Sequence, residues 1–525
     1  MSSAPDSHTA APPREQWTGQ VGFILAAIGS AVGLGNIWRF PGVAYENGGG
    51  AFLIPYLVAL ITAGIPILFL DYAIGHRFRG SAPTAFRRLG GRRSGRWLEG
   101  LGWFQVAIAF VIGLYYTVVI AWALSYFVFS FDLRWGDDPA SFLTGEYLQV
   151  GDPGFSLDFV PGVLIPLAIV WIVTIAVLAA GVAKGVQRAN VIFLPLLVVA
   201  FVVLVVRALF LDGAAAGLNA LFTPNWEALA DPNVWIAAYS QIFFSLSIAF
   251  GIMITYASYR KRKSNLTAPG LVVAFANSSF EILAGIGVFA TLGFFAFQQG
   301  VDVSELEGLT GVGLSFITFP AIVSQMPGGP IFGALFFGSL TMAGFTSLLS
   351  VLQVVSAAFQ EKFGLSPRQA AVRVGGVSAI LSILIFSTTT GLLALDTADQ
   401  WANNIGIVAS AVLSTVLVVW VMRKGDELRF HLNAVSTFRV GKMWIFLVGV
   451  LAPILLAYML ISRIITLIID GYADLPAWYL GVVGWGTIAF IVVAAIVFTM
   501  LRWKRDPNDF TAWPEYAVVT KEHRS

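Results

Sequence analysis

Twelve apolar stretches, each long enough to cross a lipid bilayer as a helix, follow one another along this 525-residue chain. A helix needs about 20 residues to span a hydrocarbon core roughly 30 Å thick. Only 11% of the residues are charged, whereas a typical soluble domain has about 25%. The pattern therefore predicts an all-α membrane protein with twelve transmembrane helices. The spans are expected at roughly 17–45, 51–76, 98–131, 161–181, 189–211, 234–259, 268–298, 330–360, 369–388, 392–422, 441–470 and 478–501.

The basic residues predict the orientation of these spans. Seven arginines lie at the junction of spans 2 and 3, from Arg77 to Arg96, and the run Arg260 to Lys263 follows span 6. Basic loops stay on the cytoplasmic side of a membrane. Counting crossings from these loops places both termini in the cytoplasm, with the protein in the cell membrane. We interpret the arginines as topogenic charge rather than as lipid-binding residues. Residues 1–13 are expected to form a disordered tail, and residues 506–525 a second cytoplasmic tail.

The composition excludes several kinds of chemistry. The chain has no cysteine, so disulfides, thiolate metal sites and cysteine nucleophiles are impossible. It has no GxxxxGK[ST] phosphate loop of an ATP-driven pump, and its spans show no nucleophile–base pair or metal cluster. A net charge of +2 does not indicate nucleic acid binding. We therefore expect a membrane protein that is not an enzyme.

Two spans contain sequences that favour a break in mid-membrane. Span 1 carries the glycine-rich run Gly29 to Asn36, and span 6 carries the run Ser245 to Gly251. Each glycine costs roughly 1 kcal/mol of helix propensity relative to alanine. Such small residues can also serve close helix packing. However, interrupted helices at matching positions in two halves of a chain point to the binding site of a transporter.

The backbone at these breaks predicts the charge of the ligand. The second half of span 1 would present free N–H groups at Gly33 to Gly35, and a helix N-terminus favours an anion such as a carboxylate. The first halves of spans 1 and 6 end in carbonyls that suit an ammonium group or a small hard cation. Neutral oxygen-bearing side chains suit a monovalent cation, although each can also form an ordinary interhelical hydrogen bond. Those in mid-membrane are Asn36, Ser245, Asn277, Thr346 and Ser347.

These residues and their order resemble the neurotransmitter:sodium symporter family, close to its prokaryotic amino-acid transporters with the LeuT-like fold. The resemblance extends from Arg14 to about span 12. It rests on Gly29 to Pro41 with Trp38-Arg39-Phe40, Glu46 to Phe52, Tyr115-Tyr116, Trp235 to Tyr259, Asn277 and Ala343 to Ser347. It implies an inverted five-helix repeat with broken helices 1 and 6. The repeats would cover residues 14–211 and 234–424, with an extracellular loop at 212–233 and spans 11 and 12 in 425–505.

The resemblance also implies two sodium sites and a substrate site. The ligands of the first sodium ion would be the substrate carboxylate, the Ala31 carbonyl, Asn36, Ser245 and Asn277, with Ser245 standing where many relatives have threonine. Those of the second would be the carbonyls of Gly29, Val32 and Ala343 and the hydroxyls of Thr346 and Ser347. The substrate would contact Ala31, Gly33, Gly35, Ile112, Tyr116, Phe244, Ser245, Ser247, Phe250, Ser347 and Val351. This largely apolar set predicts a neutral, hydrophobic amino acid.

The family pattern further implies gates and a carboxylate in place of chloride. Arg39 and Asp399 resemble an outer gate, and Phe250 with Tyr116 a lid over the substrate. Arg14, Tyr259 and Glu361 resemble an inner gate, with glutamate where aspartate is usual. Glu281, one helical turn after Asn277, stands where chloride-dependent relatives have serine, so transport is expected to be independent of chloride.

Two alternatives remain open at this point, and the oligomeric state is not indicated. The first is a sodium-coupled carrier of another small zwitterion or amine. The second is a membrane receptor of the same fold that does not transport.

Overall fold

The computed structural model describes residues 15–306, 309, 311–508, 510 and 512–514. Within these residues, ten helical segments are long and apolar enough to cross a membrane. Five are single helices, namely α6 (Ala82–Phe129), α8 (Pro161–Ala179), α13 (Thr267–Gln299), α16 (Gly329–Phe363) and α17 (Pro367–Phe386). Two of the longer segments near the N-terminus contain shorter helices: Gly50–Phe78 contains α4 (Leu53–Ala59) and α5 (Ile65–Phe78), and Val182–Leu209 contains α9 (Arg188–Leu209). The last three are Gly391–Val421 with α18 (Gly391–Trp401) and α19 (Val408–Val416), Lys442–Ile469 with α21 (Lys442–Phe446) and α22 (Ala452–Ile469), and Ala477–Met500 with α23 (Ala477–Tyr479) and α24 (Gly486–Met500).

The first span is broken where its glycine-rich run predicts. Helix α1 (Gln20–Ala31) ends just before Val32 and Gly33, which are extended, and α2 (Leu34–Trp38) and α3 (Phe40–Glu46) follow at an angle of 50°. The regular hydrogen bonds of an α-helix are interrupted at Val32 and Gly33. The backbone N–H and C=O groups at this break therefore need other partners.

The sixth span is broken as well. Helix α11 (Pro232–Ser245) ends at Ser245, and α12 (Ile252–Ser258) begins only after Gly251. Between them, Ser247, Ala249 and Gly251 have positive φ angles of 54°, 67° and 88°. This conformation costs a residue with a side chain roughly 1–2 kcal/mol, so neighbouring groups must stabilise it. With the broken first span, eleven spans are long and apolar enough to cross a membrane. Helices α11 and α12 lie at the predicted position of the sixth span, so the twelve-helix fold and both predicted breaks are confirmed.

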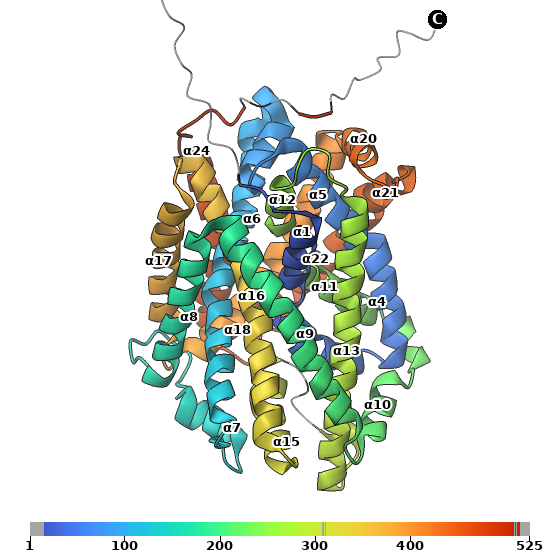
Figure 1. Ribbon diagram of the computed structural model, residues 1–525, viewed down its shortest axis with the longest axis vertical. Helices are drawn as coiled ribbons and strands as arrows, with labels where there is room; N and C mark the ends of the chain where they lie inside the picture. The colour runs from blue at the N-terminus through green and yellow to red at the C-terminus, as the bar shows by residue number, and fades with distance from the viewer. Residues whose placement is uncertain (1–14, 307–308, 310, 509, 511, 515–525) are drawn as a thin grey trace, which may run out of the picture.

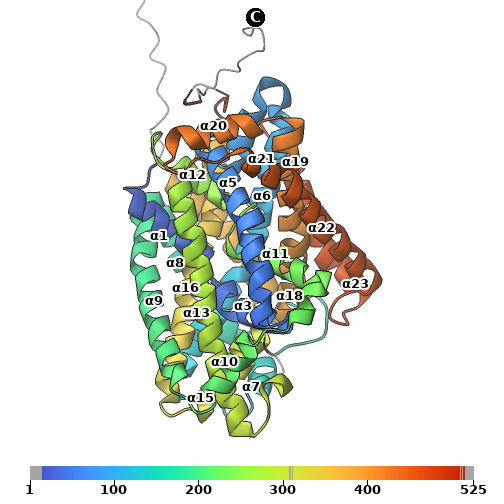
Figure 2. The same ribbon diagram turned by 90° about the vertical axis from the view of Figure 1, so that its right-hand side faces the viewer.

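The helices form one elongated bundle with distinct ends (Figures 1 and 2). Helix α12, the short helix α20 (Gly425–Val435) and the C-terminal end of α24 lie at one end, while α7 (Pro139–Ser141), α10 (Ala214–Phe222) and α15 (Phe319–Gln325) lie at the other. The basic segments after α5 and α12 belong to the first end, which we call the basic end.

Helix α6 runs through the centre of the bundle. In its most apolar stretch 94% of the residues are buried, against 22% in the last span, whose apolar side chains face outward. Helix α6 packs against α16, α24 and α8, and α16 in turn packs against α1 and α9. The breaks in spans 1 and 6 therefore lie inside a shell of continuous helices.

Candidate functional site

Three carbonyl groups at the end of α1 gather around one hydroxyl of α16. The Ser347 Oγ lies 3.3 Å from the Gly29 oxygen, 3.0 Å from the Ser30 oxygen and 3.5 Å from the Val32 oxygen. A serine hydroxyl has only one proton, so it can satisfy one of these carbonyls at a time. The remaining lone pairs make this a site suited to a cation.

The other residues predicted for the second sodium ion lie in the same place. The Thr346 hydroxyl lies 3.0 Å from the Ala343 oxygen on α16. Thr346 also lies close to α1, since its Cβ is 3.5 Å from the position of a Cβ built on Gly29. The oxygens are all neutral, and among the described residues no group of three or more His, Asp or Glu side chains forms a metal site. This donor set fits a monovalent ion better than a divalent one.

The side chains predicted for the first sodium ion form a hydrogen-bonded chain across three helices. Asn36 Nδ2 donates to Asn277 Oδ1 at 2.8 Å, and Asn277 Nδ2 donates to Ser245 Oγ. All three side chains are buried. The chain thus joins α2, α11 and α13 at the level of both breaks, and its role as a sodium site stays a prediction.

The expectation of free amides at the start of α2 is wrong for the first two of them. The Gly33 N–H donates to Asn36 Oδ1 at 2.9 Å, and the Leu34 N–H donates to the Tyr116 hydroxyl oxygen at 3.1 Å. An asparagine three residues into the helix caps it, because this side chain reaches back to the unsatisfied amides of the first turn. Tyr116 keeps its own O–H available as a donor toward a carboxylate.

Two glycines of span 1 allow other groups to approach the backbone closely. A Cβ on Gly33 would lie 2.6 Å from Ser347 Oγ and 2.8 Å from the Tyr116 hydroxyl. A Cβ on Gly35 would collide with the ring of Phe244. The predicted substrate contacts Gly33, Gly35, Tyr116, Phe244 and Ser347 are therefore neighbours in space.

The remaining predicted substrate residues line the interior of the same region. Ile112, Phe250 and Val351 are buried, as is Ala31 at the end of α1. The Ser247 hydroxyl, in the break of span 6, donates to the Ser30 oxygen at 3.0 Å. This bond connects the two breaks directly, and the contact of each of these residues with substrate stays a prediction.

Glu281 occupies a buried pocket made of hydrogen-bond donors. Its Oε1 accepts from Gln241 Nε2 at 2.6 Å, and its Oε2 accepts from the Tyr56 hydroxyl. The Tyr56 oxygen also lies 2.8 Å from Ser278 Oγ. Tyr56, Gln241 and Ser278 were not among the predicted residues, because nothing in their spacing shows that α4, α11 and α13 meet there. These donors would suit an anion, and the carboxylate of the protein itself already fills the place.

Asp71 is a second buried carboxylate that sequence reasoning missed. It lies on α5, and its Oδ2 accepts from the N–H of Ala249 in the span 6 break at 3.0 Å. The oxygen of Ala249 accepts from the Ser410 hydroxyl. Asp71 and Ser410 thus hold both polar groups of a residue with positive φ. An acid within the apolar span 2 was the available signal, since such residues are rare and usually functional.

The predicted outer gate residues are not paired with each other. No ion pair joins Arg39 to Asp399 among the described residues; the guanidinium of Arg39 instead lies over the ring of Phe244, 5.1 Å from its centre. Asp399 Oδ1 accepts from Asn403 Nδ2 at 2.6 Å. Arg39, Phe244 and Asp399 are all partly exposed.

The basic end of the site is closed by Trp17. Its backbone N–H donates to the Tyr259 oxygen at 3.3 Å, and its indole N–H donates to the Tyr256 oxygen at 2.9 Å. Gln353 Nε2 donates to the Tyr259 hydroxyl at 2.9 Å. Trp17 and Tyr259 are both buried, so the path toward this end is packed shut. Trp17 is the first residue of the expected first span, and its role at this end was not predicted.

Glu361 does not lie free at the inner gate. Its carboxylate accepts from the backbone N–H of Ser81 at 3.0 Å and from the Ser81 hydroxyl at 2.7 Å, and it also accepts from Thr84. These bonds satisfy the N-terminus of α6. Arg14 lies outside the described residues, so the predicted inner gate of Arg14, Tyr259 and Glu361 stays a prediction.

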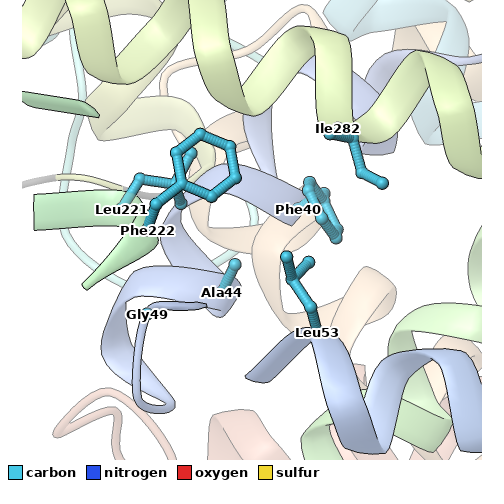
Figure 3. A pocket seen from close by; sticks show the side chains of 7 residues that line it. All are labelled: Phe40, Ala44, Gly49, Leu53, Leu221, Phe222 and Ile282. Atoms are coloured by element: carbon cyan, nitrogen blue, oxygen red, sulfur yellow. The ribbon is translucent and has the colours of Figure 1, made fainter. Parts of the chain in front are cut away.

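A small, partly open cavity beside this region is apolar and separate from the predicted site. It has a volume of about 10 Å³, room for a single water molecule, and lies between α3, α4, α10 and α13 (Figure 3). It is lined by Phe40, Ala44, Gly49, Leu53, Leu221, Phe222 and Ile282. None of these is a predicted substrate or sodium residue.

Comparisons with known proteins agree with this architecture. The model of the sodium:neurotransmitter symporter family matches residues 14–147 and 136–506. An uncharacterized sodium-dependent transporter of Methanocaldococcus jannaschii is 39% identical over 468 residues, which cover 89% of this chain and 94% of that protein. The sodium- and chloride-dependent creatine transporter 1 of Homo sapiens is 32% identical over 79% of this chain and 72% of its own length.

A solved structure shows the same fold. The crystal structure of MhsT in complex with L-phenylalanine matches with a TM-score of 0.73 and 35% identity, over 86% of this chain and 100% of MhsT. The family and its neighbours are transporters and not enzymes, as the sequence predicts. The chain therefore belongs to the sodium:neurotransmitter symporter family.

Proposed function

We propose that this protein is a sodium-coupled symporter of neutral, hydrophobic amino acids that works by alternating access and does not require chloride. The observation that carries the proposal is the convergence of three α1 carbonyls on Ser347, beside Gly33 and the Tyr116 hydroxyl. Carbonyl oxygens for cations and a hydroxyl donor for a carboxylate lie together at two broken helices, as zwitterion transport requires.

The lining of the site supports an apolar substrate side chain. Ile112, Phe244, Phe250 and Val351 are apolar, and the proposed contact set contains no acidic residue to bind a second amine. MhsT, which shares the fold at 35% identity, was crystallised with L-phenylalanine. We therefore expect aromatic and large aliphatic amino acids to bind more tightly than charged ones.

Two sodium ions would be bound together with the substrate. Asn36, Asn277 and Ser245 offer neutral oxygens, so the substrate carboxylate would supply the negative charge at the first ion. Ion and substrate then complete each other's site, which makes their binding free energies interdependent. Each charge that crosses 100 mV adds about 2.3 kcal/mol, so the sodium gradient and membrane potential can drive accumulation. The basic end would face the cytoplasm, together with both termini.

Chloride independence rests on Glu281. The hydrogen bonds from Tyr56 and Gln241 to its carboxylate occupy the donors that an anion would need. The matched creatine transporter is named as chloride-dependent. In this chain the Glu281 carboxylate would occupy the place of the chloride ion.

The test is sodium-dependent binding and uptake with the purified full chain. We expect labelled phenylalanine to bind in sodium but not in choline, to be displaced by large neutral amino acids, and to enter proteoliposomes equally well in chloride and in gluconate. Ser347→Ala should abolish sodium-dependent binding. Ser378→Ala should not, since that hydroxyl only bonds the Val374 oxygen of its own helix at 2.8 Å.

Three results would contradict the proposal. Displacement by amines or by creatine rather than by amino acids would refute the substrate class. Binding without uptake would favour a receptor. Loss of uptake in gluconate would refute chloride independence.

A further inference from the structure

An apolar groove of about 890 Å³ opens on the side of the bundle, and none of its lining residues belongs to the broken spans. Helices α6 and α16 form its floor, and α17 and α24, on the same side of the bundle in Figure 1, form its walls. Several of its residues are strongly exposed, including Val377 at 55% and Val493 at 56%. Because these helices span the membrane, the exposed residues face lipid rather than water.

The groove has the length of one leaflet. On α17 it extends from Gln369 to Leu381, which at 1.5 Å per residue is about 18 Å. Half of a typical hydrocarbon core is about 15 Å. One end of the groove lies at the basic end of the molecule, where α16 ends and α17 begins. Its aromatic lining consists of Trp103, Phe110, Phe359, Phe363, Phe490 and Phe498.

Two cations lie at that end of the groove. Arg373 and Lys504 both line it and are exposed, and neither forms an ion pair or a side-chain hydrogen bond within the described part of the chain. The Lys504 backbone N–H donates to the Lys362 oxygen at 3.0 Å, and its side chain lies against Gly364. This fixes the position of Lys504 at the rim.

The neighbouring lysine is already neutralised. Lys362 forms a fully buried ion pair with Glu99 at 2.5 Å, and Arg87 binds the other oxygen of the same carboxylate. No acidic residue lines the groove. The rim therefore carries uncompensated positive charge directly above an apolar channel.

We propose that this groove binds one anionic phospholipid of the cytoplasmic leaflet, with its phosphate between Arg373 and Lys504 and an acyl chain along the aromatic lining. A phosphate with negative net headgroup charge satisfies both cations, whereas an acyl chain gains little free energy by moving from the bilayer into the groove. Specificity would therefore come from the headgroup charge and from the shape of the groove.

A second copy of this chain is a poorer occupant. A two-fold symmetric contact brings the same patch of both copies together. It would place Arg373 and Lys504 of one protomer near those of the other without any acidic residue of the groove between them, and like charges repel. A phospholipid has the opposite charge and the length of the groove.

The site connects the lipid to the transport helices. Helix α16 carries Ser347 and Thr346 at its middle and the groove residues Phe359 and Phe363 near its end, and α6 carries Tyr116 as well as Trp103. A lipid wedged against both helices would stabilise their packing. Because this inference needs only the membrane orientation, it stands or falls independently of the proposed substrate.

The test is native mass spectrometry of the full chain in mild detergent, titrated with phosphatidylglycerol or with phosphatidylcholine of the same acyl chains. We expect one phosphatidylglycerol to bind at least tenfold more tightly than phosphatidylcholine. R373A/K504A should lose this preference. R368A/R502A, which removes two exposed cations outside the groove, should keep it.

A second pair of variants tests the apolar channel without changing charge. Ala494→Trp fills the groove and should weaken phosphatidylglycerol binding at least fivefold, while Val492→Trp, on the same helix outside the groove, should not. Thermal unfolding of each variant without added lipid shows whether it is folded. Equal loss in R368A/R502A, equal binding of both lipids, or a dimer that Ala494→Trp dissolves would each overturn the proposal.

Discussion

Replacing Glu281 by serine should make transport depend on chloride. Glu281 lies one helical turn from Asn277, a predicted ligand of the first sodium ion, which corresponds to a separation of about 6 Å along the axis. Two unit charges 6 Å apart interact by roughly 3 kcal/mol at an effective dielectric constant of 20. Loss of the carboxylate should therefore weaken sodium-dependent substrate binding by about 100-fold in gluconate. In chloride, Tyr56, Gln241 and the new serine hydroxyl can bind the anion in its place.

The assay is saturation binding of labelled substrate at fixed sodium, in chloride and in gluconate. The wild type should have the same affinity in both, and Glu281→Ser should recover most of its lost affinity in chloride. Glu281→Gln is the matched control, because it removes the charge but keeps the volume, so it should stay weak in both media. If Glu281→Ser binds equally in the two media, or if Glu281→Gln responds to chloride in the same way, the assignment of this pocket is refuted.

Three further variants test the breaks and the basic end. In Asp71→Asn, a neutral side chain replaces the charged acceptor of the Ala249 N–H in the span 6 break. Substrate affinity should therefore fall roughly fivefold, about 1 kcal/mol. An unchanged affinity in the same binding assay would show that this carboxylate does not support the site. Gly33→Ala places a Cβ 2.6 Å from Ser347 Oγ and should reduce sodium affinity by tenfold or more, whereas Gly441→Ala, which meets nothing within 4 Å, should have no effect. Burial and the neighbouring basic groups lower the pKa of His431, in α20, to about 2, so below pH 6.5 the unfolded chain binds a proton that the folded chain excludes. The melting temperature in detergent should therefore fall between pH 7 and pH 5, and the decrease should be smaller in His431→Gln.

Hydropathy and glycine content predicted the spans and their breaks because both are local properties. A helix in lipid must satisfy its own backbone, so apolar length alone identifies it, and a run such as Gly29 to Asn36 weakens it wherever it lies. The residues that support the breaks were not predicted, because their contacts join helices that are distant in the sequence. Asp71, Tyr56 and Gln241 act on other helices, and the partners of a mostly apolar helix surface cannot be read from periodicity.

The prediction of free amides at Gly33 and Leu34 failed because nearby polar side chains accept hydrogen bonds from both N–H groups. Asn36 was assigned only as a sodium ligand, yet it lies at the third position of α2 and caps that helix. Similarly, Arg39 and Asp399 were expected as a pair, but a sequence does not say which conformation is present. Here Arg39 and Asp399 are partly exposed and unpaired with each other, while Trp17 packs the opposite side of the site.

The Ser30 carbonyl shows how ion binding could move such a carrier. It accepts from Ser247 in the break of span 6 and from Ser347 on α16, both at 3.0 Å. A carbonyl oxygen has two lone pairs, so these two hydroxyls leave none for a third partner. A cation at the neighbouring carbonyls of Gly29 and Val32, the predicted sodium ligands, would take the Ser347 oxygen as a further ligand and so compete with these carbonyls' contacts to the Ser347 hydroxyl. A change at the Ser347 hydroxyl would then also affect the contact between spans 1 and 6, because Ser347 and Ser247 share the Ser30 oxygen. Sodium thus has different contacts before and after this rearrangement, which is the differential interaction that any ligand-driven shift between two conformations requires.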